Sequence, residues 1–111
     1  MSEAQHPLGF ELLEPWTSIA GDPLALSTEL QREVREDGIL FGCTTKAIAV
    51  RQDCDDVLFR VEGLSEQFAV VHLTWSGRRD QTTGFPSTEL FRDAEDWRSR
   101  CMVPDHEDFF C

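Results

Sequence analysis

The side chains best suited to chemistry in this sequence are its cysteines and histidines. The four cysteines are Cys43, Cys54, Cys101 and Cys111. They lie 11, 47 and 10 positions apart, so the chain lacks the close CxxC pairs from which most tetrahedral zinc sites are built. A nucleophilic cysteine would need a histidine partner, and the spacing leaves both His72 and His106 open for that role. Free thiols without a catalytic role are the simpler interpretation.

A second chemical feature is the acidic run Asp53-Cys54-Asp55-Asp56. Carboxylates at this density suggest a cation site. A calcium loop, however, also needs alternating oxygen ligands, a glycine and a distal glutamate in fixed register, and these are absent. We therefore interpret the run as an aspartate-rich turn, and we predict no metal and no cofactor.

A third group of candidate residues surrounds the polar stretch 76–86. Trp75 precedes the adjacent bases Arg78 and Arg79, and an aromatic beside arginine suits a carboxylate or phosphate ligand. Ion pairing of these arginines with acidic helices is the alternative. With the histidines added, the candidate binding residues are His72, Trp75, Arg78, Arg79 and His106.

The net charge of −11 is the strongest global feature. Residues 1–38 carry −6, residues 39–79 carry zero, and residues 80–111 carry −5. A negative surface repels phosphate backbones, which argues against nucleic-acid binding, and it attracts basic proteins. Solubility alone is the competing explanation of the charge.

The 111 residues are enough for one domain with a single modest core, so we expect residues 1–111 to fold together. No apolar stretch approaches the roughly 18 residues that would span a membrane. The first ten residues lack the basic and apolar regions of a signal peptide. These features predict a cytoplasmic protein.

Two apolar runs, 57–61 and 68–75, flank a glycine-containing turn and predict a β-hairpin. In the second run Ala69, Val71 and Leu73 point one way while the alternate residues, His72 among them, point the other. Both faces of this run begin apolar, which is typical of a central strand. Two further short strands are predicted over 39–41 and 46–51, and residues 87–91 are interpreted as either a short strand or the entry to a helix.

The clearest helix signal covers residues 22–38. Asp22 is a good N-cap, Pro23 suits the first helical position, and Gly38 suits the C-terminal end. The apolar stripe contains Leu24, Leu26, Leu30 and Val34. The opposite surface, with Glu29 and Glu33, is expected to face solvent.

A second helix is predicted to start at the N-cap Asp93, with Asp96 three residues on, and to end at Pro104. Residues 1–21 are expected to be irregular, and residues 105–111 to form an acidic tail. The predicted fold class is therefore α+β: a mostly antiparallel sheet of four or five strands with an N-terminal and a C-terminal helix, packed largely on one face.

The succession DDVLF, AVVHLTWSG, TELF and PDH is similar to a group of small uncharacterised bacterial proteins, over roughly residues 40–106. The resemblance implies no activity. A strong preference for arginine over lysine also fits a GC-rich bacterial genome.

Two functional hypotheses follow. The first is a non-enzymatic interaction protein of the inhibitor or immunity type that binds a basic partner, anchored by Trp75, Trp97 or the terminal Phe109 and Phe110. The second is a small enzyme or ligand-binding domain with a pocket around His72, Trp75, Arg78 and Arg79. A homodimer through an edge strand is compatible with either.

Overall fold

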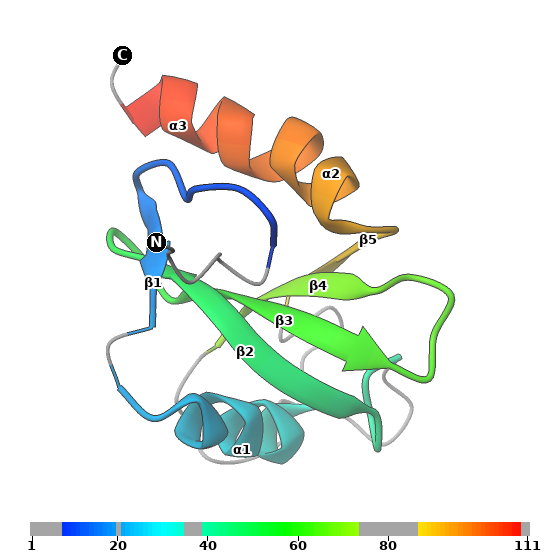
Figure 1. Cartoon of the computed structure of the whole chain (residues 1–111). Helices are drawn as coiled ribbons and strands as arrows, with labels where there is room; N and C mark the ends of the chain where they lie inside the picture. The colour runs from blue at the N-terminus through cyan, green and yellow to red at the C-terminus, as the bar shows by residue number, and fades with distance from the viewer. Residues whose placement is uncertain (1–7, 20, 35–38, 74–86, 110–111) are drawn as a thin grey trace, which may run out of the picture.

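The computed structural model describes residues 8–19, 21–34, 39–73 and 87–109, which form one antiparallel sheet with helices on both sides (Figure 1). The five strands are β1 (Trp16–Ser18), β2 (Thr44–Arg51), β3 (Asp56–Glu62), β4 (Phe68–His72) and β5 (Ser87–Phe91). Their order in the sheet is β1-β2-β3-β4-β5, so every strand pairs with its neighbours in sequence. The α+β class and the predicted hairpin, now β3–β4, are confirmed.

The helices cover opposite faces of this sheet, and the prediction that both lie on one face is wrong. Helix α1 (Pro23–Glu33) lies below the sheet in Figure 1. The C-terminal helix lies above it and runs through α2 (Ala94–Trp97), a π-helical segment (Arg98–Met102) and α3 (Val103–Phe109). Apolar side chains on both faces of β3 and β4 explain this, because one layer of helix would leave half of them in water.

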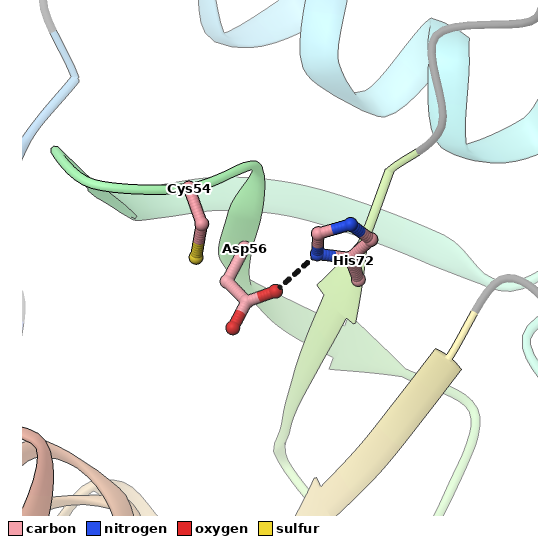
Figure 2. Close-up of side chains that lie close together, drawn as sticks. All are labelled: Cys54, Asp56 and His72. Atoms are coloured by element: carbon pink, nitrogen blue, oxygen red, sulfur yellow. Dashed lines mark hydrogen bonds and ion pairs between the residues drawn. The ribbon is translucent and has the colours of Figure 1, made fainter.

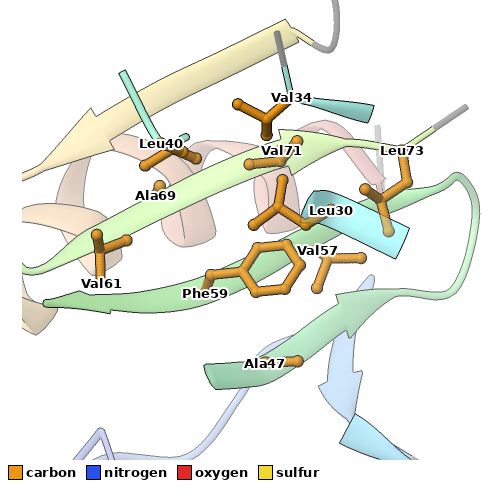
Figure 3. Packing of buried hydrophobic residues seen from close by; sticks show 10 residues of the cluster. All are labelled: Leu30, Val34, Leu40, Ala47, Val57, Phe59, Val61, Ala69, Val71 and Leu73. Atoms are coloured by element: carbon orange, nitrogen blue, oxygen red, sulfur yellow. The ribbon is translucent and has the colours of Figure 1, made fainter. Parts of the chain in front are cut away.

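Each face of the sheet has its own hydrophobic cluster. The cluster between α1 and the sheet contains the following residues: Leu30, Val34, Leu40, Ala47, Val57, Phe59, Val61, Ala69, Val71 and Leu73 (Figure 3). The cluster on the other face contains Leu8, Trp16, Ile48, Ala49, Leu58, Phe68, Phe91, Trp97 and Met102. Strand alternation therefore assigns the odd-numbered residues of β3 and β4 to α1 and the even-numbered ones to the C-terminal helix.

Two tryptophans fill the centre of the second cluster. The rings of Trp16 and Trp97 meet edge to face at 5.2 Å, and Phe10 stacks on Trp97 at 6.3 Å. Trp97 is fully buried, so it cannot be the exposed anchor suggested by its sequence position. Trp16 lies in β1, a strand inside the segment predicted to be irregular.

A β-bulge in β2 makes two successive residues face the same side of the sheet. Its register with β3 shifts between Ala47 and Ala49. Ala47 consequently packs under α1, whereas Ile48 and Ala49 both pack toward the C-terminal helix.

Helix α1 begins as predicted and ends early. The Asp22 carboxylate accepts a hydrogen bond from the Leu24 backbone N–H at 2.9 Å, and Pro23 follows it. The helix ends at Glu33, with Val34 already extended. The predicted exposure of Glu29 and Glu33 is wrong, because they are only 4% and 1% exposed.

The C-terminal helix begins with the predicted cap and continues past the predicted stop. The Asp93 carboxylate accepts from the Asp96 N–H at 2.8 Å, and the Asp96 carboxylate accepts from the Arg92 N–H at 2.9 Å. Pro104 does not end the helix. The π-helical turn before it bonds the Val103 N–H to the Arg98 carbonyl, five residues back, and this wider turn leaves room for the proline ring.

Two further differences concern short segments. Residues 39–41, predicted as a strand, form a turn, and residues 105–109 of the predicted tail are helical.

The cysteines Cys43, Cys54 and Cys101 are free thiols. Among the described helices none combines the length and apolar character needed to cross a membrane.

Leu30 and Leu24 form a matched pair for testing the first core. Leu30 is 0% exposed beneath the sheet, whereas Leu24, on the same helix, is 71% exposed. We expect Leu30→Ala to lower the free energy of unfolding by about 2–5 kcal/mol. Leu24→Ala should change it by less than about 0.5 kcal/mol. Urea denaturation measures both values, and equal effects would contradict this assignment of the α1 face.

The cap at Asp96 generates a pH prediction. The Arg92 backbone N–H and, next, the Arg100 guanidinium hold the pKa of the Asp96 carboxyl below its usual value. Because the folded-state pKa is depressed, the carboxylate stabilises the fold above about pH 4, and this stabilisation is lost as the pH falls through the folded-state pKa.

We therefore expect Asp96→Asn to lower stability at pH 7 and to reduce the loss of stability between pH 7 and pH 3. Urea unfolding across that range measures both effects. The exposed Glu107→Gln serves as the control variant. An unchanged pH dependence in Asp96→Asn would show that this carboxylate does not contribute.

Candidate functional site

The side chains best suited to catalysis or metal binding meet at one end of the sheet, where the turn between β2 and β3 lies beside the end of β4. Asp56 and His72 are direct partners in the β3–β4 register. The Leu73 N–H also donates to the Asp55 carbonyl at 3.2 Å, which holds the two strand ends together. Partners opposite each other in a sheet share a face, so both side chains lie on the face of the C-terminal helix.

Cys54, Asp56 and His72 form the cluster shown in Figure 2. The His72 Nδ1 lies 2.8 Å from the Asp56 Oδ1. The cysteine sulfur, a carboxylate oxygen and a ring nitrogen all lie within 4.8 Å of one another. Cys54 is exposed, and the other two side chains are partly exposed, so the cluster is open to solvent.

The electrostatics of this cluster argue against a cysteine nucleophile. Partial burial raises the pKa of the Cys54 thiol above its usual value, and this effect exceeds the opposing effects of the Asp56 backbone hydrogen bond and the Arg51 charge. A reactive cysteine needs a positive neighbour that stabilises the thiolate. Here the Nδ1 of His72 is engaged by the Asp56 carboxylate instead. Sulfur, imidazole nitrogen and carboxylate oxygen are, however, the donor types that Zn²⁺ binds in proteins.

Of the five residues predicted from the sequence, the structure describes His72 and His106, and it places these two in different clusters. His72 belongs to the cluster just described. His106 lies on α3, where its Nδ1 is 2.7 Å from the Glu14 carbonyl oxygen, and it is not a member of that cluster. Trp75, Arg78 and Arg79 lie outside the described residues, so the hypothesis of a pocket around them remains a prediction.

A second feature of the same end is a hydrogen-bonded group centred on Asp105. Its Oδ2 accepts from the Trp16 Nε1 at 2.9 Å and lies 3.4 Å from the Arg51 guanidinium. Arg51 also makes a two-pronged ion pair with Asp53, at 2.9 and 2.8 Å, which holds the pKa of that carboxyl below its usual value. Asp105 thus connects α3, β1 and the end of β2.

Further carboxylates lie on the segments that this group joins. We define the acidic end as Glu11, Glu14, Asp53, Asp55, Asp56, Asp105, Glu107 and Asp108. Glu11 and Glu14 line a surface hollow together with Gln52, which places the N-terminal segment beside the β2–β3 turn. Glu107 and Asp108 follow Asp105 on α3, whose last turn lies on the same side as β1 in Figure 1.

Four arginines elsewhere on the described surface are paired with other acids. Arg98 contacts Glu95 at 2.6 Å, and Arg100 contacts Asp96 at 2.9 Å. Arg92 lies 3.6 Å from Asp96, and Arg32 lies 3.8 Å from Glu29. These pairs reduce the local charge around α1 and the start of the C-terminal helix. The acidic end, in which Arg51 pairs with Asp53 and Asp105, keeps a large excess of negative charge.

Sequence reasoning interpreted Asp56 and Cys54 as parts of a turn, and it considered Asp105 only as part of a tail. The spacing Cys54-x-Asp56 was not a sufficient signal, because residues 52–55 form a turn, in which strand alternation does not decide the direction of a side chain. The register that brings His72 to them was not available from the sequence. No protein-family model, curated protein or solved structure matches the chain at a significant level, so the likeness to small bacterial proteins also stays a prediction.

Cys101 and Cys54 should differ in reactivity. Burial raises the pKa of the Cys101 thiol far above its usual value, and the Asp105 carboxylate 3.4 Å from its sulfur raises it further. We expect iodoacetamide at pH 8 to modify the exposed Cys54 well before Cys101. Timed labelling of the metal-free protein, followed by peptide mass spectrometry, measures this order. Modification of Cys101 first would contradict the packing of α3 on the N-terminal segment.

Proposed function

We propose that this chain is a non-enzymatic interaction module of a bacterial cytoplasm whose acidic end binds a basic protein, in the manner of a small inhibitor or immunity protein. The observation that carries the proposal is the segregation of charge. Arg51 pairs with Asp53 and Asp105 at the acidic end and is outnumbered there by the eight carboxylates of that set, whereas the arginines of the C-terminal helix are paired with acids of their own.

Segregated charge supports binding because it attracts a partner of opposite charge while the two proteins are still apart. A surface of one sign raises the association rate with a partner of the opposite sign, and its effect decreases as salt screens it. The same surface repels phosphate backbones, so we expect no nucleic-acid binding. Glu29 and Glu33, which we expected to face solvent, do not contribute to this surface, since both are buried.

Long-lived binding also needs an apolar anchor, and Phe109 is suited to this. It is 42% exposed and follows Glu107 and Asp108 directly on α3. An exposed aromatic next to acidic residues resembles part of the usual arrangement of an interface, in which an apolar centre carries most of the energy and charged residues surround it. Of the other anchors suggested by the sequence, Trp97 is buried, while Trp75 and Phe110 lie outside the described residues.

The test compares two double variants of equal net charge. Glu107→Gln with Asp108→Asn neutralises part of the acidic end, and Glu62→Gln with Glu66→Gln neutralises the β3–β4 turn. The wild-type chain is first used at low salt to capture partners from a lysate of the source cells, and the basic protein retained is identified and purified. Surface plasmon resonance then measures its binding to each variant.

We expect the Glu107/Asp108 variant to bind roughly twofold to thirtyfold more weakly, mainly through slower association, and the Glu62/Glu66 variant to bind like the wild type. Phe109→Ala should instead speed dissociation. Equal loss in both double variants would show that only net charge matters. Retention of no basic protein, or binding that does not weaken with salt, would contradict the proposal.

A further inference from the structure

We propose that Cys54, Asp56 and His72 form a binding site for a divalent transition metal of the zinc class, with three protein ligands and one position left for water. The juxtaposition of a thiol, a carboxylate and an imidazole at the end of β3 and β4 carries this inference (Figure 2). It is independent of the proposed binding to a basic protein.

The backbone places the three ligands on two adjacent segments. Asp56 is the first residue of β3, Cys54 lies two positions before it in the preceding turn, and the two side chains lie on the same side in Figure 2. His72, the last residue of β4, faces them from the register position opposite Asp56. The hydrogen bond between Leu73 and Asp55 fixes the spacing of the two segments. Strand ends held in this way limit the entropy that metal binding would cost.

The distances are compatible with one ion after small side-chain rotations. Zinc bonds of about 2.0–2.3 Å place two ligand atoms of a tetrahedral site roughly 3.3–3.7 Å apart. In the present arrangement the His72–Asp56 pair is shorter, at 2.8 Å, because the two groups share a hydrogen bond, and all three ligand atoms lie within 4.8 Å. Movements of roughly an ångström are within reach of side chains that are partly open to solvent.

The charges of the three ligands also match the charge of a divalent cation. A thiolate and a carboxylate supply two negative charges around a neutral imidazole, which balances a divalent cation. Binding forms a bond from the metal to sulfur and releases the thiol proton to solvent. It also replaces the hydrogen bond between Nδ1 and Asp56, and the histidine then carries its proton on Nε2.

The donor set selects the kind of metal. Calcium and magnesium prefer oxygen ligands alone, so sulfur and nitrogen disfavour them, and this agrees with the absence of a calcium-loop pattern around Asp53. Three protein ligands, not four, are typical of zinc sites that keep an exchangeable position. The neighbouring carboxylates of the acidic end increase the local concentration of cations.

The experiment uses the full-length, untagged chain, reduced and freed of metal, and titrates it with Co²⁺ and then Zn²⁺. A thiolate bound to Co²⁺ gives a charge-transfer absorption in the near ultraviolet. We expect this band to saturate at one Co²⁺ per chain and to disappear when Zn²⁺ displaces the cobalt. Zinc should also raise the midpoint of thermal unfolding, because it binds the folded chain preferentially.

Matched variants identify the ligands. We expect Cys54→Ser to abolish the band and Cys43→Ser, which removes another free thiol, to keep it. His72→Gln should weaken Zn²⁺ binding roughly tenfold or more in calorimetry, whereas His106→Gln should bind like the wild type. Asp56→Asn supplies a second test of the same kind, and circular dichroism verifies that each variant is folded.

Three results would overturn the proposal. One is a wild-type chain that shows no saturable band at one equivalent of Co²⁺. Another is a band that survives in Cys54→Ser, which would assign the metal to a different thiol. The third is a folded His72→Gln and a folded Asp56→Asn that both bind zinc as tightly as the wild type, which would reduce the site to a single cysteine.

Discussion

Burial of both faces of the five-stranded sheet is the constraint on which the rest of this structure depends. Strands β3 and β4 carry apolar side chains on both sides, so the sheet needs a helical layer on each. Helix α1 supplies one layer and the C-terminal helix supplies the other (Figure 1). The alternation that fills both cores also decides where the polar residues at the strand ends point. Asp56 and His72 thereby come to lie on the face of the C-terminal helix.

Attachment of the C-terminal helix gives the molecule its acidic end. The π-helical turn lets the helix continue past Pro104, and this continuation places Asp105 against Trp16 and Arg51. The Trp16 ring belongs to the buried cluster, while the charges of Arg51 and Asp53 are at the surface. One carboxylate therefore connects the hydrophobic core to the charged surface. The position of Glu107, Asp108 and Phe109 follows from that attachment.

The candidate metal ligands and the acidic end share the β2–β3 turn, and this gives them a common electrostatic environment. Asp56 belongs to both sets, and Asp53 and Asp55 flank Cys54. A divalent ion at this point would offset part of the negative charge that we propose steers a basic partner. The two roles are chemically separate, since one requires sulfur and nitrogen ligands and the other only net charge.

Local patterns in the sequence were sufficient for much of the fold. The caps at Asp22 and Asp93 and the alternation of β3 and β4 depend on a few neighbouring residues, and these predictions are confirmed. Predictions that depended on distant packing were less successful. The burial of Glu33 and the continuation of the helix through Pro104 come from contacts and turns that short windows of sequence do not encode.

The sequence by itself determined the α+β composition, the excess of negative charge and the presence of thiol, imidazole and carboxylate groups. Only the tertiary structure decided that Cys54, Asp56 and His72 meet, and that Asp105 joins Arg51 and Trp16. The reason is physical. Alternation specifies which face of a strand a residue occupies, but the pairing of strands and the layering of helices are set by the burial of the whole chain.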